Sequence, residues 1–282
     1  MAAPTAICSQ AGWLRCLTPG ISSRLGLVRH ALFDFDGTLS LLRQGWEEVM
    51  IPMMVEAICG EQAPEPELEA EVRDYVDRST GILTIRQMEW LVEAVRRHHT
   101  TGSVGTAAAY KKQYLARLEQ RIMHRRQAVA DGRETAESHM LVGALDFVRA
   151  LAGRGAILYL ASGSDHADVA REAAVLGLAP FFNGGIYGAL DEDESNAKEK
   201  VIQGILEGHH LNGNQLLVVG DGPVEIREAT ARQAIALGVA SDEVNRCGWN
   251  RRKVDRLTSA GADLLVADFS QASELAWLLL GS

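Results

Sequence analysis

The sequence has no apolar run that approaches the roughly 20 residues needed for a membrane-spanning helix. It also lacks an excess of basic residues. The formal net charge is −9, so no broad positive field attracts a nucleic acid or an acidic membrane surface. That charge does not exclude a local site for a small anion. We therefore expect a protein that binds neither nucleic acid nor membrane.

Cysteine is scarce and widely spaced, at positions Cys8, Cys16, Cys59 and Cys247. No Cys-x-x-Cys spacing occurs, so the sequence predicts neither a zinc site nor a disulfide framework. The pair His209–His210 has no third ligand near it in the sequence and indicates no zinc site either. A reducing compartment, the cytoplasm, is the resulting expectation.

Acidic residues are absent from residues 1–33, where Arg15 and Arg24 occur. This composition is compatible with an organelle-targeting peptide, although no clear amphipathic repeat accompanies it. The alternatives are a short basic extension and a start codon placed upstream of the true one. We expect residues 1–28 to form an N-terminal extension outside the core.

The sequence does contain a series of short apolar runs that alternate with helical patterns. Such continuous runs are typical of strands covered by helices on both faces of a sheet. The runs occupy residues 30–35, 156–161, 215–220, 234–240 and 263–269. Apolar residues at helical spacing occupy 141–151, 169–176, 200–206 and 225–234. The series predicts an α/β fold with a doubly wound, mostly parallel sheet and right-handed crossovers.

A long stretch without any strand-like run separates the first two predicted strands. It is far too long for one crossover connection. Helical patterns fill it, at residues 46–58, 67–76, 84–95 and 107–123. We therefore predict a helical cap at residues 41–136, inserted into a core formed by residues 29–40 and 137–282.

Polar residues follow three of the predicted strands at their carboxyl ends, where open α/β sheets bind ligands. Two acids that are two residues apart repel each other and cost free energy to desolvate, so folding alone gives no reason for them. No Gly-x-Gly-x-x-Gly follows the first strand, which argues against a dinucleotide site. The candidate groups, in chain order, are Asp34, Asp36, Ser162, Lys198, Asp221 and Glu225.

The order of these groups resembles the haloacid dehalogenase superfamily of phosphohydrolases. The helical insert resembles the cap of the branch that contains phosphoglycolate phosphatase and β-phosphoglucomutase. The resemblance covers residues 29–40 and 137–282. The motifs that carry it are Asp34-Phe-Asp36-Gly-Thr, Ser162-Gly163, Lys198 and Gly-Asp221-Gly-Pro-Val-Glu225.

The resemblance implies a phosphatase that hydrolyses a small phosphorylated metabolite, such as a sugar phosphate or a phosphoglycolate-like acid. Asp34 would be the nucleophile that forms an aspartyl phosphate. Asp36 would be the general acid for the leaving alcohol and then the base for water. Mg²⁺ would be held by Asp34, the backbone carbonyl of Asp36 and Asp221. Glu225 is a further candidate for the metal site. Because its side chain is one methylene longer than that of Asp, it would contact a metal-bound water or Lys198 rather than the ion itself.

Phosphoryl oxygens would be bound by Ser162, by Lys198 and by the N–H groups of Phe35 and Gly163. Lys200 is the alternative to Lys198, which we prefer because of its place at the entrance of a helix.

Residues just after the first motif and in a cap loop can face the same carboxyl edge of the sheet and recognise the leaving group. They are Arg43, Trp46 and the segment 80–82.

Alternatives to hydrolysis remain open. A phosphomutase would have the same catalytic residues, and a catalytically silent binding module would keep the fold alone. A dehalogenase is disfavoured because its chemistry does not need the acid at Asp36. The expected partner is a small phosphorylated metabolite, and the expected assembly is a monomer or a homodimer.

Overall fold

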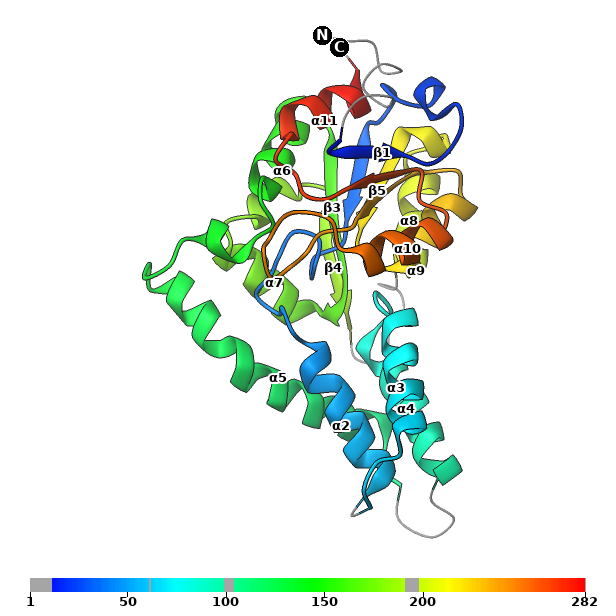
Figure 1. Ribbon diagram of the computed structural model, residues 1–282. Coiled ribbons are helices and arrows are strands. Elements are labelled where there is room, and N and C mark those ends of the chain that lie inside the picture. The colour runs from blue at the N-terminus through cyan, green and yellow to red at the C-terminus, as the bar shows by residue number, and fades with distance from the viewer. Residues whose placement is uncertain (1–11, 61, 99–103, 191–197, 282) are drawn as a thin grey trace.

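The structure is a computed structural model that describes residues 12–60, 62–98, 104–190 and 198–281. A sheet with helices on both faces forms one part of the molecule, and a group of helices projects from one end of it (Figure 1). No helix among the described residues is both long enough and apolar enough to cross a bilayer.

The sheet has seven strands in the described residues, with β2 near its middle. All neighbouring strands are parallel except the edge strand β1, which is antiparallel to β7. The spatial order is β1 (Leu14–Cys16), β7 (Leu264–Val266), β6 (Ile235–Val239), β5 (Leu216–Gly220), β2 (His30–Phe33), β3 (Ile157–Asp165) and β4 (Gly185–Ala189).

The central strands are buried along their whole length. Every side chain of β2, β5 and β6 is buried, because helices cover both faces of the sheet. One face carries α6 (Ala144–Gly153), α7 (His166–Val175) and α11 (Ala272–Leu280). The other face carries α8 (Lys198–Gly208), α9 (Pro223–Ala231) and α10 (Arg251–Ser259). The predicted doubly wound, mostly parallel α/β fold is confirmed.

Two strands escaped the sequence analysis. Strand β4 contains Gly185 and Gly188 and lacks a continuous apolar run. Strand β1 is three residues long and lies within the predicted extension 1–28. Leu14 and Ile21 are buried in the same hydrophobic cluster as the sheet, so the core begins earlier than predicted. A strand this short gives no detectable periodicity.

The projecting helices are α2 (Glu47–Cys59), α3 (Pro66–Arg78), α4 (Thr84–His98) and α5 (Ala107–Ala130). They pack around a hydrophobic cluster of their own, which includes Met53, Val72, Leu91 and Leu118. We call α2–α5 with their connections the cap. The remaining short 3-10 turns are η1 (Ile21–Ser23), η2 (Ala136–His139), η3 (Ala179–Phe181) and η5 (Gly213–Gln215).

The described cysteines differ in state. Cys59 and Cys247 are free thiols, whereas Cys16 is disulfide-bonded. The prediction of no disulfide is therefore wrong at Cys16. A disulfide depends on how closely the fold brings two Cα atoms together, which sequence spacing does not show.

Candidate active site

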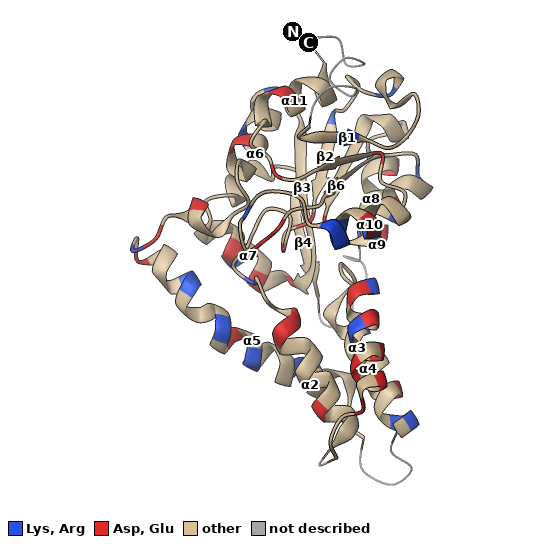
Figure 2. Cartoon of the chain, viewed as in Figure 1, with Lys and Arg blue, Asp and Glu red and all other residues tan. Residues whose placement is uncertain are grey.

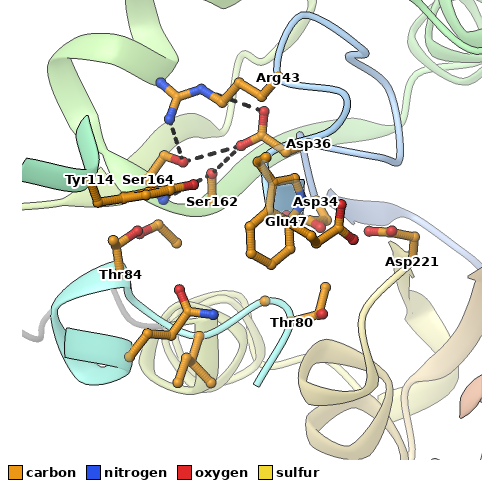
Figure 3. Close-up of a pocket in the computed structure, with 15 residues that line it drawn as sticks. Asp34, Asp36, Arg43, Glu47, Thr80, Thr84, Tyr114, Ser162, Ser164 and Asp221 are labelled. Carbon is orange, nitrogen blue, oxygen red and sulfur yellow. Dashed lines mark hydrogen bonds and ion pairs between the residues drawn. The ribbon is translucent and has the colours of Figure 1, made fainter. Parts of the chain in front are cut away.

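The carboxyl ends of three neighbouring strands bring the predicted acids and the serine together (Figure 3). Asp34 follows β2, Ser162 lies in the last part of β3, and Asp221 follows β5. Lys198 is the first residue of α8 and is buried beside them. Lys200, the alternative lysine, is exposed. The structure thus places the predicted groups at one edge, as expected for an open α/β sheet.

The loop after β2 depends on Gly37. Its φ is +76°, and a Cβ there would lie 2.6 Å from Asp221 Oδ2. Glycine alone allows both the left-handed backbone and this close approach. Among the described residues, the Phe35 N–H finds no acceptor and the Asp36 carbonyl finds no donor. One free donor and one free acceptor therefore remain in the loop for a ligand.

Each of the three aspartates contacts a buried cation that also contacts a second acid. For Asp34 the cation is Lys198, whose Nζ lies 2.8 Å from Asp34 Oδ1 and 3.0 Å from Glu225 Oε2. The other oxygen of Glu225 accepts a hydrogen bond of 2.8 Å from the Gly222 N–H at the start of α9. Glu225 is thus fixed by its own helix and by Lys198.

For Asp221 the cation is Lys253 of α10. Its Nζ lies 2.7 Å from Asp221 Oδ2 and 2.7 Å from Glu243 Oε1. Arg256, one turn further along α10, donates a hydrogen bond of 2.8 Å to the Asp221 carbonyl and pairs with Asp77 of the cap at 2.7 Å. The Asp221 loop is therefore held by α10, and α10 is linked to the cap.

For Asp36 the cation is Arg43. Its Nε lies 3.7 Å from Asp36 Oδ1, and its guanidinium forms two hydrogen bonds, of 3.0 and 2.9 Å, to the buried Glu172. The hydroxyls of Ser164 and Ser162 donate to Asp36 Oδ2 at 3.2 and 3.4 Å. Asp36 Oδ1 is buried without a hydrogen-bond partner among the described residues. The side chain of Asp36 is therefore directed toward Arg43 and the serines (Figure 3).

Burial is the largest influence on the pKa of each aspartate. It raises the pKa of Asp34 well above its usual value, with Lys198 opposing the rise and Glu225 and Asp221 adding to it. It raises the pKa of Asp36 to about 6, against the lowering effect of Arg43. Burial alone would raise the pKa of Asp221 too, but Lys253 and Arg256 more than offset it and keep this pKa low. The three carboxyls thus differ in proton affinity.

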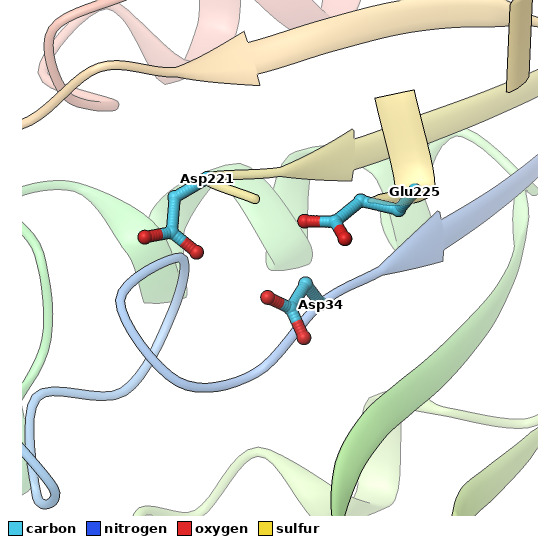
Figure 4. Close-up of side chains that lie close together, drawn as sticks. All are labelled: Asp34, Asp221 and Glu225. Atoms are coloured by element: carbon cyan, nitrogen blue, oxygen red, sulfur yellow. The ribbon is translucent and has the colours of Figure 1, made fainter. Parts of the chain in front are cut away.

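Three carboxylates face one another closely enough to be considered as metal ligands (Figure 4). Asp34, Asp221 and Glu225 each offer an oxygen within 4.8 Å of the others. Trans ligands of Mg²⁺ lie about 4.2 Å apart, since each bond is about 2.1 Å long. A hard cation therefore fits this set of oxygens after a small contraction. Glu225 is the weakest candidate because both of its oxygens are already occupied.

The cap closes the site from the other side. Thr84 Oγ1 contacts the Gly163 carbonyl at 3.4 Å. A Cβ on Gly81 would lie 2.5 Å from Glu225 Oε2, and a Cβ on Gly163 would lie 2.1 Å from the Ile82 carbonyl. The cavity between cap and core measures about 70 Å³ and is partly open to solvent. Its cap-side lining consists of Trp46, Glu47, Thr80, Gly81, Ile82, Thr84, Gln87 and Tyr114.

Sequence analysis singled out Arg43, Trp46 and residues 80–82 as able to face this edge, and all of them line the cavity. It missed Lys253, Glu243, Arg256 and Glu172. These residues lie in helices or loops without a recognisable motif, and a lone lysine or glutamate on a helix is usually solvated. The repeating pattern of acid, cation and acid could have been found only in three dimensions.

A Rossmann-like sheet with three acids at its carboxyl edge and a helical cap defines the class of this protein. The sequence matches the haloacid dehalogenase-like hydrolase family over residues 28–231. The chain therefore belongs to that family and is a hydrolase. Comparison with curated proteins finds no match.

Solved structures with the same fold come from several bacteria. A predicted phosphatase from Clostridium acetobutylicum is 17% identical, with a TM-score of 0.56 over 88% of this chain and 98% of that one. A predicted phosphoglycolate phosphatase from Haemophilus somnus is 14% identical, with a TM-score of 0.59 over 88% and 98%. A β-phosphoglucomutase from Clostridium difficile is 14% identical, with a TM-score of 0.57 over 86% and 92%. The shared feature is the fold, including the inserted cap.

Proposed function

We propose that this protein is a Mg²⁺-dependent phosphatase that hydrolyses a small phosphomonoester through an aspartyl phosphate on Asp34. The observation that carries the proposal is the position of the Asp34 carboxylate, which lies 2.8 Å from Lys198, is grouped with Asp221 and lines the cavity. Phosphoryl transfer depends mainly on positioning and charge neutralisation, and this arrangement supplies both.

Asp34 acts as the nucleophile. An ionised carboxylate is needed, yet burial raises the pKa of Asp34 and Lys198 offsets that rise only in part. A divalent cation bound by Asp34, Asp221 and the free Asp36 carbonyl would lower this pKa further and would screen the charge of a phosphate dianion. Glu225 acts by holding Lys198, at 3.0 Å, rather than by direct coordination.

Asp36 acts as the general acid and then as the base. Its pKa of about 6 lies near neutrality, where a carboxyl can both give and take a proton. The hydroxyls of Ser162 and Ser164 orient it from one side and Arg43 from the other. Asp36 gives its proton to the leaving alkoxide, and it later receives one from the water that attacks the phosphorus atom.

The phosphoryl oxygens are met by Lys198, by the Ser162 hydroxyl and by the N–H groups of Phe35 and Gly163. Ser162 reaches this role by turning its hydroxyl from Asp36 to the phosphoryl oxygen. The two backbone N–H groups are fixed donors, which stabilise the charge of the transition state without reorganising. The cap excludes bulk water from the cavity during the reaction.

Phosphatase activity is tested by measuring phosphate release from p-nitrophenyl phosphate and from a panel of phosphorylated metabolites, with and without Mg²⁺. We expect Mg²⁺-dependent release that Asp34→Asn abolishes while the circular dichroism spectrum is retained. Asp146→Asn removes an exposed carboxylate on α6 and should leave the rate unchanged. Turnover in folded Asp34→Asn protein would contradict the nucleophile.

A phosphomutase would use the same residues. The solved β-phosphoglucomutases share only the fold with this chain, so they favour neither activity. Incubation with a sugar phosphate separates the two, because hydrolysis yields free phosphate and mutase activity yields an isomer. A folded protein that acts on no phosphomonoester would instead be a binding module. A cytoplasmic location and a monomeric or homodimeric state stay predictions.

A further inference from the structure

We propose that the leaving group of the substrate carries no negative charge, and that Glu47 is a residue that determines this specificity. The inference rests on the proposed phosphatase function and narrows its substrate class. It favours the monophosphate of a small neutral alcohol over a phosphorylated acid or a bisphosphate. The observations that carry it are the charges on the cap side of the cavity.

The cap offers no cation to a second anionic group. Among the described residues that line the cavity, Arg43 is the sole lysine or arginine. Its guanidinium is already surrounded by three acids: Glu172 at 2.9 Å, Asp168 at 3.5 Å and Asp36 at 3.7 Å. A carboxylate or second phosphate on the substrate would therefore be desolvated without a free positive partner, which costs free energy.

No arginine of α2–α5 is among the described residues that line the cavity. Figure 2 shows the basic residues spread along the cap helices. Arg96 pairs with Glu93 and Arg97 pairs with Glu71, all at exposed positions. On α5, Arg117 pairs with Glu56 of α2. Lys111 and Arg126 of α5 are less exposed, but they pair with Asp165 and Glu119 and do not line the cavity.

Glu47 is the one acid on the cap side of the cavity among the described lining residues, and burial raises its pKa above the usual value. It lies in the first turn of α2 and lines the cavity near Asp34 and Asp221 (Figure 3). Its carboxylate accepts a hydrogen bond from its own backbone N–H, and Lys253 attracts it from α10. In its ionised form this acid repels a substrate carboxylate, and it can accept a hydrogen bond from a hydroxyl.

The remaining lining suits hydroxyl groups. The Tyr114 hydroxyl faces the cavity, and burial raises the pKa of Tyr114, so it stays protonated as a donor. Gln87 uses its amide nitrogen on Ser79 Oγ at 3.1 Å, which leaves its amide oxygen as an acceptor. Trp46 supplies an apolar wall. With a cavity of only about 70 Å³, the leaving group has to be small.

The test compares three phosphomonoesters of nearly equal size under saturating Mg²⁺, with the full-length protein. They are 2-hydroxyethyl phosphate, 2-phosphoglycolate and O-phosphoethanolamine, whose leaving groups are neutral, anionic and cationic. We expect kcat/KM for the neutral ester to exceed that for the anionic ester by about tenfold or more. The cationic ester shows whether any charge is rejected or only a negative one.

Two variants test whether Glu47 causes the preference for the neutral ester. Glu47→Gln should raise kcat/KM for 2-phosphoglycolate relative to the neutral ester by about threefold or more, because it removes the repelling charge. Glu48→Gln removes the neighbouring charge on the same helix turn, at an exposed position, and should leave the ratio unchanged.

Each contrary outcome has a distinct meaning. Hydrolysis of 2-phosphoglycolate at least as fast as the neutral ester would overturn the inference and leave the phosphatase function standing. Equal rejection of the anionic and cationic esters would also overturn it, since desolvation rather than the sign of the charge would then decide. A ratio that Glu47→Gln does not change would remove Glu47 from the proposal. A folded protein that hydrolyses neither these esters nor p-nitrophenyl phosphate would contradict the proposed function itself.

Discussion

The core and the cap face the same cavity with different chemistry. The core side presents three aspartates, each fixed by a buried cation that also contacts a second acid. The cap side presents hydroxyl, amide and aromatic groups and one acid, Glu47. Charged groups therefore lie on the core side, where a phosphoryl group would react. The leaving group would meet the cap side, whose described lining residues include no free lysine or arginine.

The largest expected effect comes from removing the cation beside Asp34. Lys198→Met leaves Asp34 and Glu225 buried without their shared partner, and it removes a donor for the transferred group. We expect kcat to fall by about 10²–10³-fold. Lys200→Met, two residues further along the same helix, removes an exposed charge and should keep kcat within about twofold of the wild type. Equal losses in the two variants would refute the assignment of Lys198.

A second prediction concerns the cation beside Asp36. Arg43→Met leaves the carboxylate of Glu172 buried without its main partner, and we expect a loss of about 3–5 kcal/mol in the free energy of unfolding. The double variant Arg43→Met/Glu172→Met removes both charges and should recover much of that loss. Urea unfolding of the two variants measures the difference. A double variant less stable than Arg43→Met would show that the pair does not act as a unit.

A third prediction addresses the contact between cap and core. Gly81→Ala places a Cβ 2.5 Å from Glu225 Oε2 at a φ of +96°, so the cap loop has to move away from the site. We expect kcat/KM to fall by about tenfold, since small displacements of positioning groups are costly to catalysis. Gly132→Ala is the matched control, with a φ of +67° and open space around the new Cβ. Gly132→Ala tests the backbone strain without the contact to Glu225. An equal fall in kcat/KM in this variant would contradict the proposed role of the contact between cap and core.

The smallest effect is expected at the opposite end of the sheet. His30, at the start of β2, is hydrogen-bonded to Tyr159 at 3.0 Å, and burial together with His209 lowers its pKa. The unfolded chain then binds a proton at His30 more readily than the folded chain does. Stability is therefore present above the unfolded pKa of about 6.5 and is lost as the pH falls below it.

His30→Gln should reduce the difference in Tm between pH 8 and pH 5.5. His124→Gln, at an exposed position of α5, is the control and should leave that difference unchanged. A wild-type Tm that is the same at both pH values would contradict the prediction.

Much of the fold was predictable because buried parallel strands have a distinctive composition. The strands 30–33, 216–220 and 235–239 are continuous apolar runs and were found. Strand β4, with two glycines in five residues, and the three-residue strand β1 have no such pattern. Their pairing with the sheet depends on tertiary contacts, which outweigh weak local preference.

The site was predictable to the extent that its residues belong to motifs. Asp34, Asp36, Ser162 and Asp221 follow strands whose ends must meet, so their proximity follows from topology. Lys253 and Glu172 face the site because of the rotation about the helix axis at which α10 and α7 pack against the sheet. The hydrophobic periodicity of the sequence does not specify that rotation. The place of Glu47 in the cavity lining is also a tertiary property, since nothing in the sequence shows which acids of the cap face the site.

The most direct test of the account is to look for a phosphoryl group on Asp34. The Asp36→Asn variant lacks the base for the second step and should accumulate the intermediate when it is mixed with p-nitrophenyl phosphate and Mg²⁺ and quenched in acid. Trypsin releases the peptide 30–43, and mass spectrometry of that peptide shows whether it has gained one phosphoryl group. We predict a Mg²⁺-dependent gain at Asp34. Turnover of the substrate by wild-type enzyme without any phosphorylated peptide in the variant, or with the phosphoryl group on another residue, would contradict the central claim.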